Sequence, residues 1–350
     1  MMLKDTINEI RPLSKAWYDK AWARLDNLSK PRRSLGILED IAARVTAIRE
    51  EERPRIDKKA VFVFVGDHGV VAEGVSAYPQ EVTGAMVRSF LSGGAGINVL
   101  ARRACADVSV IDIGMKEDIK DIEGLIRKNV KRGTDNMAEG PAMTVEDAEQ
   151  AVNVGIETAF VAYDEGKNMI ATGEMGIGNT TPSSAIYSVL LSCNVEDITG
   201  RGTGLEDEGI RRKIKVIERA IEINREILKT PLSILAALGG LEIAGICGLC
   251  LGGAARRMAV VVDGFISGAG ALAAMRMCPA VKEYLFFAHR SNEKGHRIFF
   301  EKEGLRPILD LDMRLGEGTG AAIAMQIIED SIAVYNEMAT FDDINIEPGA

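Results

Sequence analysis

The chain is poor in histidine, cysteine and aromatic residues, and its net charge is negative. It is 350 residues long but contains only 3 histidines and 5 cysteines, and aromatic residues make up 5% of it. So few histidines disfavour a metal centre, and an odd number of cysteines in a chain of this size favours reduced thiols. The net charge of −9 and the pI of about 5.2 argue against a nucleic-acid or anionic-membrane partner. We therefore expect no metal, and we expect any anionic ligand to be held by local groups.

The long hydrophobic runs are all interrupted. The most apolar window, 233–255, contains Glu242 and six glycines, so we interpret it as a small-residue helix pair in a protein core rather than a membrane span. Cys247 and Cys250 form a lone C-x-x-C inside this window. We interpret them as buried structural thiols, with a redox pair as the alternative. The first residues carry scattered charges without the apolar stretch of a secretory signal, which favours a cytoplasmic location.

Short apolar runs alternate with helical patterns along most of the chain. The candidate strands are 60–65, 108–113, 168–172, 258–262 and 284–288. None of them alternates with polar residues, so each is expected to be buried on both faces of a sheet. The pattern predicts an α/β fold, with a parallel sheet covered by helices on both faces.

The two ends of the chain have a different pattern. The first 55 residues read as helices with charged faces, and the last 30 carry one amphipathic helix. Its apolar stripe consists of Ala321, Ala324, Met325, Ile328, Ile332 and Tyr335. We expect residues 1–55 and 311–350 to form a small helical domain beside a large α/β domain of residues 56–310.

A polar or glycine-rich loop follows each predicted strand. These loops are 66–69, 114–116, 173–181, 263–264 and 289–295. Ligands of open α/β sheets bind beyond the carboxyl ends of the strands, so the five loops are expected to converge on one site. The loops bring Asp263 to this site and place Asp67 and His68 at its mouth. His68 either stabilises its own turn or contacts a substrate.

The loop at 173–181 has features of a phosphate-binding loop. Gly176 and Gly178 form a G-x-G, and Thr180 follows in a stretch that offers backbone N–H groups and hydroxyls. The loop lacks the lysine of a P-loop and the full dinucleotide spacing, which argues against an NTPase. A tight turn that merely needs glycine is the alternative. Glu174 would repel a phosphate, so we expect it to face sugar hydroxyls.

Two further segments supply positive charge. The glycine-rich segment 199–209 contains Gly202 and leads to Lys213, and the segment 291–295 contains Ser291 and Lys294. These groups are candidates for contact with a bound phosphate. The alternative for the cations is a solvated helix face.

The stretch "RLGEGTGAA" at 314–322 places Glu317 between two glycines, directly after Leu315. Glycine on either side allows unusual backbone angles and close approach of a ligand to the carboxylate. The alternative is a glutamate at the start of a helix, near the positive end of its dipole.

Taken in order, the loops resemble those of the nicotinate-nucleotide:dimethylbenzimidazole phosphoribosyltransferase family of the cobalamin lower-ligand pathway. The resemblance runs from about residue 28 to about residue 335 in nine collinear blocks. These blocks are "KPRRSLGILE", "GDHGV", "PQEVT", "GTDNMAEGPAM", "GEMGIGNTTPSSA", "GGLEIAGICG", "VDGFISGAGALAA", "EKG" and "MRLGEGTGAA". Nine blocks in one order are far more specific than any single block.

The resemblance implies a Rossmann-like parallel sheet and a small helical domain built from both chain ends. It implies a homodimer in which each partner completes the other's active site. The implied reaction moves the phosphoribosyl group of nicotinate mononucleotide to 5,6-dimethylbenzimidazole, giving nicotinate and α-ribazole 5'-phosphate for cobalamin nucleotide-loop assembly. The family requires no metal or organic cofactor.

That reaction needs one general base. The pyridinium leaving group departs as a neutral ring, whereas the acceptor must lose an N–H proton as its other nitrogen attacks C1'. The family's base falls in the block "RLGEGTG", which implies this role for Glu317. By the same correspondence of blocks, the resemblance implies that Gly176, Lys213 and Ser291 bind the phosphate and that Glu174 contacts the ribose.

Tyr78 and Met86 stand where some relatives have smaller or amide side chains. A ring and a thioether suit stacking in the acceptor pocket, although both residues could also fill core space. The acceptor therefore stays open between dimethylbenzimidazole, other benzimidazoles, a purine and a phenol. Two other functional classes are also compatible with such a sheet, namely a nicotinamide-dependent oxidoreductase and a non-catalytic nucleotide sensor.

Overall fold

A computed structural model describes residues 2–119, 122–202 and 204–345. Within them, a six-stranded parallel sheet has the order β3-β2-β1-β4-β5-β6. This is the strand order of the doubly wound Rossmann fold, so the predicted α/β class and its Rossmann-like sheet are confirmed. The strands are β1 Lys59–Gly66, β2 Ala106–Gly114, β3 Leu125–Arg127, β4 Met169–Met175, β5 Ala259–Val262 and β6 Leu285–Phe287.

Five of the six strands coincide with the runs predicted from the sequence. β1 and β5 are buried along their whole length, as expected for apolar strands covered on both faces. The sequence analysis missed β3, which has three residues at the edge of the sheet and exposes two of them. So short a half-exposed run has no hydrophobic pattern to reveal it.

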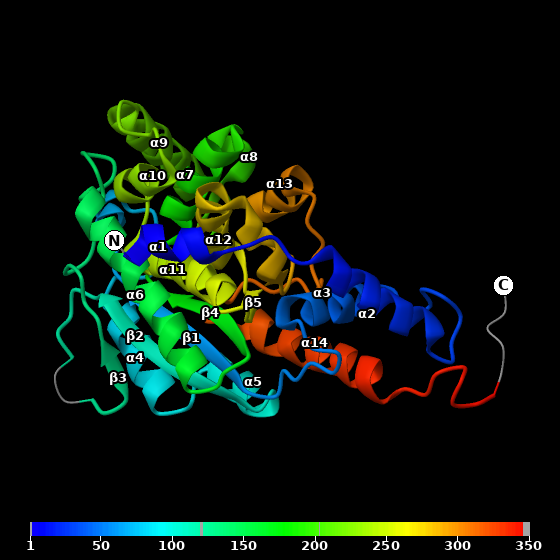
Figure 1. Ribbon diagram of the computed structural model, residues 1–350. Coiled ribbons are helices and arrows are strands. Elements are labelled where there is room, and N and C mark those ends of the chain that lie inside the picture. Colours follow the sequence, from blue (N-terminus) through cyan, green and yellow to red (C-terminus); the bar gives the residue numbers. More distant parts are fainter. Residues whose placement is uncertain (1, 120–121, 203, 346–350) are drawn as a thin grey trace.

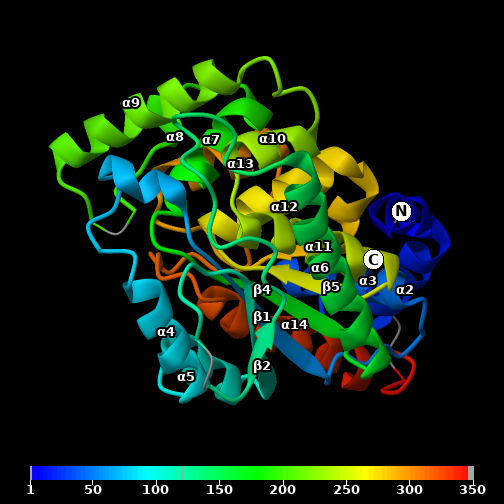
Figure 2. The ribbon, with the colours of Figure 1, turned by 90° about the vertical axis from the view of Figure 1, so that its left-hand side faces the viewer.

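Helices cover both faces of the sheet. Figures 1 and 2 show α6 and α11 on one side of it and α4, α5 and α14 on the other. The α-helices are α1 Met2–Glu9, α2 Lys15–Asn27, α3 Ile37–Arg49, α4 Val82–Leu91, α5 Gly96–Arg103, α6 Val145–Asp164, α7 Thr180–Leu191, α8 Val195–Ile198, α9 Asp207–Asn224, α10 Pro231–Leu238, α11 Leu241–Ala255, α12 Phe265–Met277, α13 Lys294–Glu303 and α14 Thr319–Glu337, with 3-10 turns η1 Gly69–Glu73 and η2 Pro279–Tyr284.

The apolar window 233–255 folds into α10 and α11, as expected, and α11 is buried on every side as far as Ala254. Its main helical neighbour is α6 rather than α10. A Cβ atom at Gly155 or at Gly248 would lie 1.9 Å from a carbonyl oxygen of the facing helix, so glycine allows this close approach.

The structure buries Cys247 and Cys250 as free thiols. No helix in the described ranges is both long and apolar enough to cross a membrane.

The two chain ends lie side by side, as Figure 1 shows for α2, α3 and α14. Ser29 donates its N–H to the Ala339 carbonyl at 2.9 Å, and Phe341 donates to that of Asn27 at the same distance. The predicted apolar stripe of α14 is entirely buried. Part of α14 also packs on β4 and β5, and one hydrophobic core joins the ends to the sheet. The division at residues 55/56 and 310/311 therefore stays a prediction.

Candidate active site

A cavity of about 390 Å³ lies beyond the carboxyl end of β4. This position, near the point where the strand order reverses, is where Rossmann folds bind ligands. The lining includes nine of the twelve site residues predicted from the sequence, namely Tyr78, Met86, Glu174, Gly176, Thr180, Gly202, Ser291, Leu315 and Glu317. Gly178, Lys213 and Asp263 do not line the cavity.

Three of the five predicted loops reach this cavity, and the expectation that all five converge is wrong. Loops 173–181, 263–264 and 289–295 contribute to the lining, together with 314–317 and with Phe265. The loop 66–69 lies behind Gly176, because a Cβ atom there would meet the Gly66 carbonyl oxygen at 2.2 Å. Loop 114–116 supports 66–69 instead, since Lys116 donates its N–H to the Asp67 carboxylate at 2.9 Å.

His68 is buried rather than placed at the mouth of the site. Its Nε2 lies 2.8 Å from a carboxylate oxygen of Glu242, at the start of α11. The ring also supports the site loop, since a Cβ atom at Gly176 would lie 3.1 Å from Nε2. Of the two alternatives for His68, the structure therefore favours a role in the local backbone. Glu242 was not singled out as a site residue in the sequence, where it looked like an exception in an apolar helix.

Glu317 has a left-handed backbone conformation, with a φ of 64°. Gly316 and Gly318 on either side also have positive φ, of 85° and 94°. A Cβ atom at Gly316 would lie 2.2 Å from a carboxylate oxygen of Glu174, so glycine is required by space as well as by angle. A non-glycine residue in this region stores backbone strain, which is typical of functional sites.

Asp263 holds this strained loop in place. Its carboxylate accepts the N–H of Gly318 at 3.2 Å and that of Ala321 at 2.9 Å, at the start of α14. Burial raises the pKa of Asp263, and the His289 side chain and these backbone N–H groups oppose the rise. The sequence analysis placed Asp263 among the substrate-binding residues. Its carboxylate is instead bonded to the loop that carries Glu317.

The Glu317 side chain is 5% exposed and faces the cavity. One carboxylate oxygen accepts the N–H of Ile97 at 3.1 Å, at the first turn of α5. Burial raises the pKa of Glu317, the Ile97 hydrogen bond lowers it, and the negative charge of Asp263 raises it further. Ile97 was missed because it lies in an ordinary amphipathic helix with no polar side chain to mark it.

Glu174 is the second carboxylate in the cavity. The side-chain amide of Asn179 donates to one of its oxygens. Burial raises the pKa of Glu174 to about 8, against the lowering effect of the Asn179 bond and with a further rise from Asp263 and Glu242. At pH 7 most Glu174 side chains are therefore protonated, so the residue can donate as well as accept a hydrogen bond.

Gly176, Thr180 and Gly202 form a polar wall of the cavity, where α7 begins. Lys213 lies one layer behind this wall, fully buried, and its Nζ donates to the Thr180 hydroxyl at 2.7 Å. Burial lowers the pKa of Lys213 to about 8, and the carboxylate of Glu293 opposes this effect. Gly178 turns away from the cavity, because a Cβ atom there would meet Val71 at 2.7 Å.

Ser291 is fixed by two hydrogen bonds. Its N–H donates to Nδ1 of His296 at 2.8 Å, and its hydroxyl accepts the N–H of Glu293 at 3.3 Å. Burial among aromatic rings lowers the pKa of His296 to about 3, so its imidazole stays neutral and Nδ1 stays an acceptor. Among the residues that the structure describes, no acceptor takes the hydroxyl proton of Ser291, which can therefore point at a ligand.

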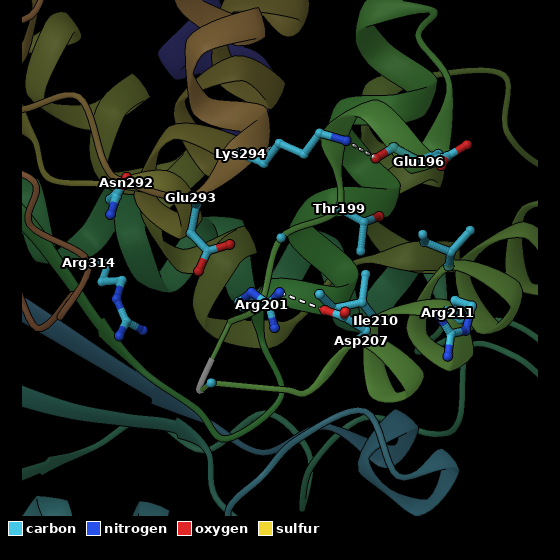
Figure 3. A pocket seen from close by; sticks show the side chains of 13 residues that line it. Glu196, Thr199, Arg201, Asp207, Ile210, Arg211, Asn292, Glu293, Lys294 and Arg314 are labelled. Atoms are coloured by element: carbon cyan, nitrogen blue, oxygen red, sulfur yellow. Dashed lines mark hydrogen bonds and ion pairs between the residues drawn. The ribbon is translucent and has the colours of Figure 1, made fainter.

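A second, larger cavity of about 670 Å³ adjoins the first, and both are lined by Glu293 and Arg314 (Figure 3). Figure 3 shows the Glu293 side chain between those of Arg314 and Arg201. Arg201 is paired with Asp207 at 2.6 Å, and Lys294 donates to the Glu196 carbonyl at 2.9 Å. Lys294, a candidate phosphate ligand in the sequence, therefore faces this outer cavity.

One part of the first cavity is apolar. Met86, Phe265 and Ile266 line it, and Tyr78 and Leu315 stand at its open edge, 54% and 61% exposed. Phe265 was not predicted, although it follows Asp263 by only two residues.

In the described parts of the chain, no three His, Cys, Asp or Glu side chains are grouped so that they could hold a metal ion.

Comparison with known proteins places these features in a family. The family model DBI_PRT, described as phosphoribosyltransferase, matches residues 10–346. The nicotinate-nucleotide–dimethylbenzimidazole phosphoribosyltransferase of Pelodictyon phaeoclathratiforme is 55% identical over 96% of this chain and 95% of its own length. The protein of the same name from Geobacter metallireducens is 54% identical over 99% of both chains. The crystal structure of CobT from Thermus thermophilus superimposes with a TM-score of 0.91 at 44% identity, over 95% of this chain and all of that one.

Proposed function

Because the chain belongs to the nicotinate-nucleotide–dimethylbenzimidazole phosphoribosyltransferase family, and is thus a pentosyltransferase, we propose that it uses the substrates in that name. The donor is nicotinate mononucleotide and the acceptor is 5,6-dimethylbenzimidazole or a related lower-ligand base. The products are nicotinate and α-ribazole 5'-phosphate, for the assembly of the cobalamin nucleotide loop.

Glu317 is the general base of this reaction. Its carboxylate faces the cavity, one oxygen is fixed by Ile97, and the left-handed backbone between two glycines keeps it in place. Its raised pKa brings its basicity closer to that of the N–H group that it must deprotonate. This fixed, buried carboxylate is the observation that carries the proposal. Holding both flat rings across one ribose would supply much of the remaining rate.

Glu174 forms hydrogen bonds with the hydroxyls of the ribose. A carboxyl group with a pKa of about 8 is mostly protonated at pH 7 and makes a poor base there. It is well suited to exchange hydrogen bonds with sugar hydroxyls, which both donate and accept. If Glu317 were not the base, Glu174 would be the alternative, because it is the other carboxylate at this end of the cavity.

The donor phosphate binds at the polar wall formed by Gly176, Thr180, Gly202 and Ser291. The start of α7 supplies backbone N–H groups and the positive end of a helix dipole. Lys213 acts through Thr180: because the Thr180 hydroxyl accepts from the lysine, its own proton is free for a phosphate oxygen. This arrangement supplies the local positive charge that an acidic protein otherwise lacks.

The acceptor ring binds in the apolar part of the cavity, where Met86, Phe265 and Tyr78 are among the lining residues. Exposed Tyr78 and Leu315 at the rim leave this side open in a single chain. A second copy of the chain would cover it, which is the reason to propose a homodimer.

An anaerobic product assay tests the reaction. Purified protein is incubated with nicotinate mononucleotide and a panel of benzimidazoles, purines and phenols, and released nicotinate and new nucleotides are identified. We expect nicotinate together with an α-linked nucleotide of one or more benzimidazoles. Folded protein that binds the mononucleotide but forms no product with any acceptor would refute the proposed reaction.

A further inference from the structure

A third cavity, of about 360 Å³, lies between α2 and α3, at the N-terminal end of the chain, and the edge strand β6. It shares no lining residue with the two cavities described above. Tyr18 and Trp22 on α2, Arg44 on α3 and Phe286 on β6 provide its main surfaces. Its volume is in the range of small-molecule sites, and its lining includes the aromatic side chains of Tyr18, Trp22, Phe286 and Phe287.

Arg44 is the unusual member of this cavity. Its guanidinium lies 3.7 Å from the centre of the Phe286 ring, so it stacks on an aromatic floor. Across the described residues, its Nε is buried without a hydrogen-bond partner, and no ion pair holds the group. Burial lowers the pKa of Arg44 to about 10, which leaves it a cation at neutral pH. Arg44 as a whole is half-buried, and a cation partly withdrawn from water is more stable with an anion beside it.

The acidic groups near Arg44 are already engaged or face solvent. Tyr18, Asp40 and Glu283 are the groups whose charges oppose the lowering of its pKa. Asp40 lines the cavity but is exposed to solvent, and a carboxylate oxygen of Glu283 accepts the N–H of Leu13 at 2.8 Å. Arg306 and Lys282 add positive charge to the lining. The cavity therefore combines a net positive charge with aromatic walls.

We propose that this third cavity binds a planar aromatic carboxylate, with its carboxylate on the Arg44 guanidinium and its ring against Tyr18 and Trp22. A guanidinium has a planar fork of N–H donors that matches a carboxylate, and its stacking on Phe286 keeps that fork in a fixed plane. Nicotinate, the leaving group of the proposed reaction, belongs to this ligand class. The site itself rests on the third cavity and not on that reaction.

The two tryptophans of the chain allow a direct test. Trp17 and Trp22 are the only ones in the sequence, and only Trp22 lines the third cavity. In full-length protein carrying Trp17→Phe, Trp22 fluorescence is followed during titration with benzoate and, separately, with nicotinate. We expect a saturable change with both carboxylates and none with neutral benzamide. Arg44→Gln should weaken the apparent affinity by at least about tenfold, while phosphoribosyl transfer continues.

Two further variants keep this test decisive. Arg306 is exposed, so Arg306→Gln should fold normally and weaken the affinity by about two- to fivefold through loss of charge. Arg297→Gln removes a surface charge on α13, where Arg297 pairs with Glu301 at 3.1 Å outside the cavity, and should leave the affinity unchanged. The proposal is overturned if no saturable change occurs, if benzamide acts like benzoate, or if Arg44→Gln and Arg306→Gln both bind as tightly as the parent.

Discussion

At the scale of single residues, neighbouring groups distinguish two carboxylates of the same chemical type, because Glu174 and Glu317 are equally buried, each 5% exposed. Glu174 lies near Asp263 and Glu242, and burial raises its pKa to about 8. The Glu317 carboxylate accepts a hydrogen bond from the N–H of Ile97, and this bond partly offsets the rise in pKa that burial causes. A pKa of about 8 makes Glu174 a poor base at neutral pH, which supports the proposal of Glu317 as the base, and the neighbours that distinguish the two residues are not close to them in the sequence.

The position of Lys213 leads to a prediction about phosphate recognition. Lys213→Met should raise the KM for nicotinate mononucleotide by about ten- to a hundredfold, because a charge-assisted contact is lost. The KM for the dephosphorylated nucleoside should change little. Lys215→Met, an exposed lysine on the same helix, serves as the control. Equal effects on the two donors would remove Lys213 from the phosphate site.

Lys213 should also make the affinity for the phosphorylated donor depend on pH. Lys213 is an ammonium below its pKa of about 8 and neutral above it. Affinity for the phosphorylated donor should therefore be complete at low pH and fall as the pH rises through about 8. Initial rates at several donor concentrations from pH 6 to 10 measure this fall, and it should be absent with Lys213→Met.

At the scale of secondary-structure elements, the hydrophobic pattern was sufficient to locate five strands and the buried stripe of α14. It was not sufficient to decide which loops reach the cavity. Loop 66–69 has the composition of a site loop, yet Gly176 packs directly over it and hides it. The role of Asp263 was likewise beyond the sequence, because its bonds to 318–321 join segments more than 50 residues apart. The place of Glu317 at the cavity was predictable, because its flanking glycines mark an unusual backbone conformation locally.

The glycine contacts between α6 and α11 make a prediction about stability. In Gly248→Ala the new Cβ atom would lie 1.9 Å from the Val152 carbonyl oxygen, which forces the two helices apart. We expect the free energy of unfolding to fall by about 1–3 kcal/mol. Gly140→Ala, where nothing lies within 4 Å, should change it by no more than about 0.5 kcal/mol. Urea unfolding measures both, and similar values for the two variants would contradict the account of this interface.

At the scale of the whole molecule, the fold gathers its polar groups at one end of the sheet and leaves one side of the site open. Tyr78, Leu311 and Leu315 are large apolar residues, each more than half exposed, and two of them line the cavity rim. Single exposed apolar residues are ordinary, but a group of them at the edge of a ligand cavity favours coverage by another chain.

The proposed homodimer gives the prediction at this scale. Light scattering should yield a mass of about twice the 37.8 kDa of one chain. Tyr78→Lys, at the exposed rim, should shift the protein toward monomers and lower turnover together. A native protein that is monomeric at assay concentration and fully active would show that one chain completes its own site.

The central claim is that Glu317 is the general base, and single-turnover kinetics of Glu317→Gln test it most directly, with Glu174→Gln as the matched control. We expect Glu317→Gln to slow phosphoribosyl transfer by about a hundred- to ten-thousandfold while nicotinate mononucleotide still binds within about threefold of the parent affinity. Glu174→Gln should lose less, because glutamine resembles a protonated carboxyl group. Parent turnover should fall as the pH drops through the raised pKa of Glu317, since only its ionised form accepts the proton, and this limb should vanish in Glu317→Gln. Near-normal transfer by Glu317→Gln with an unchanged acid limb would contradict the account and move the base role to Glu174.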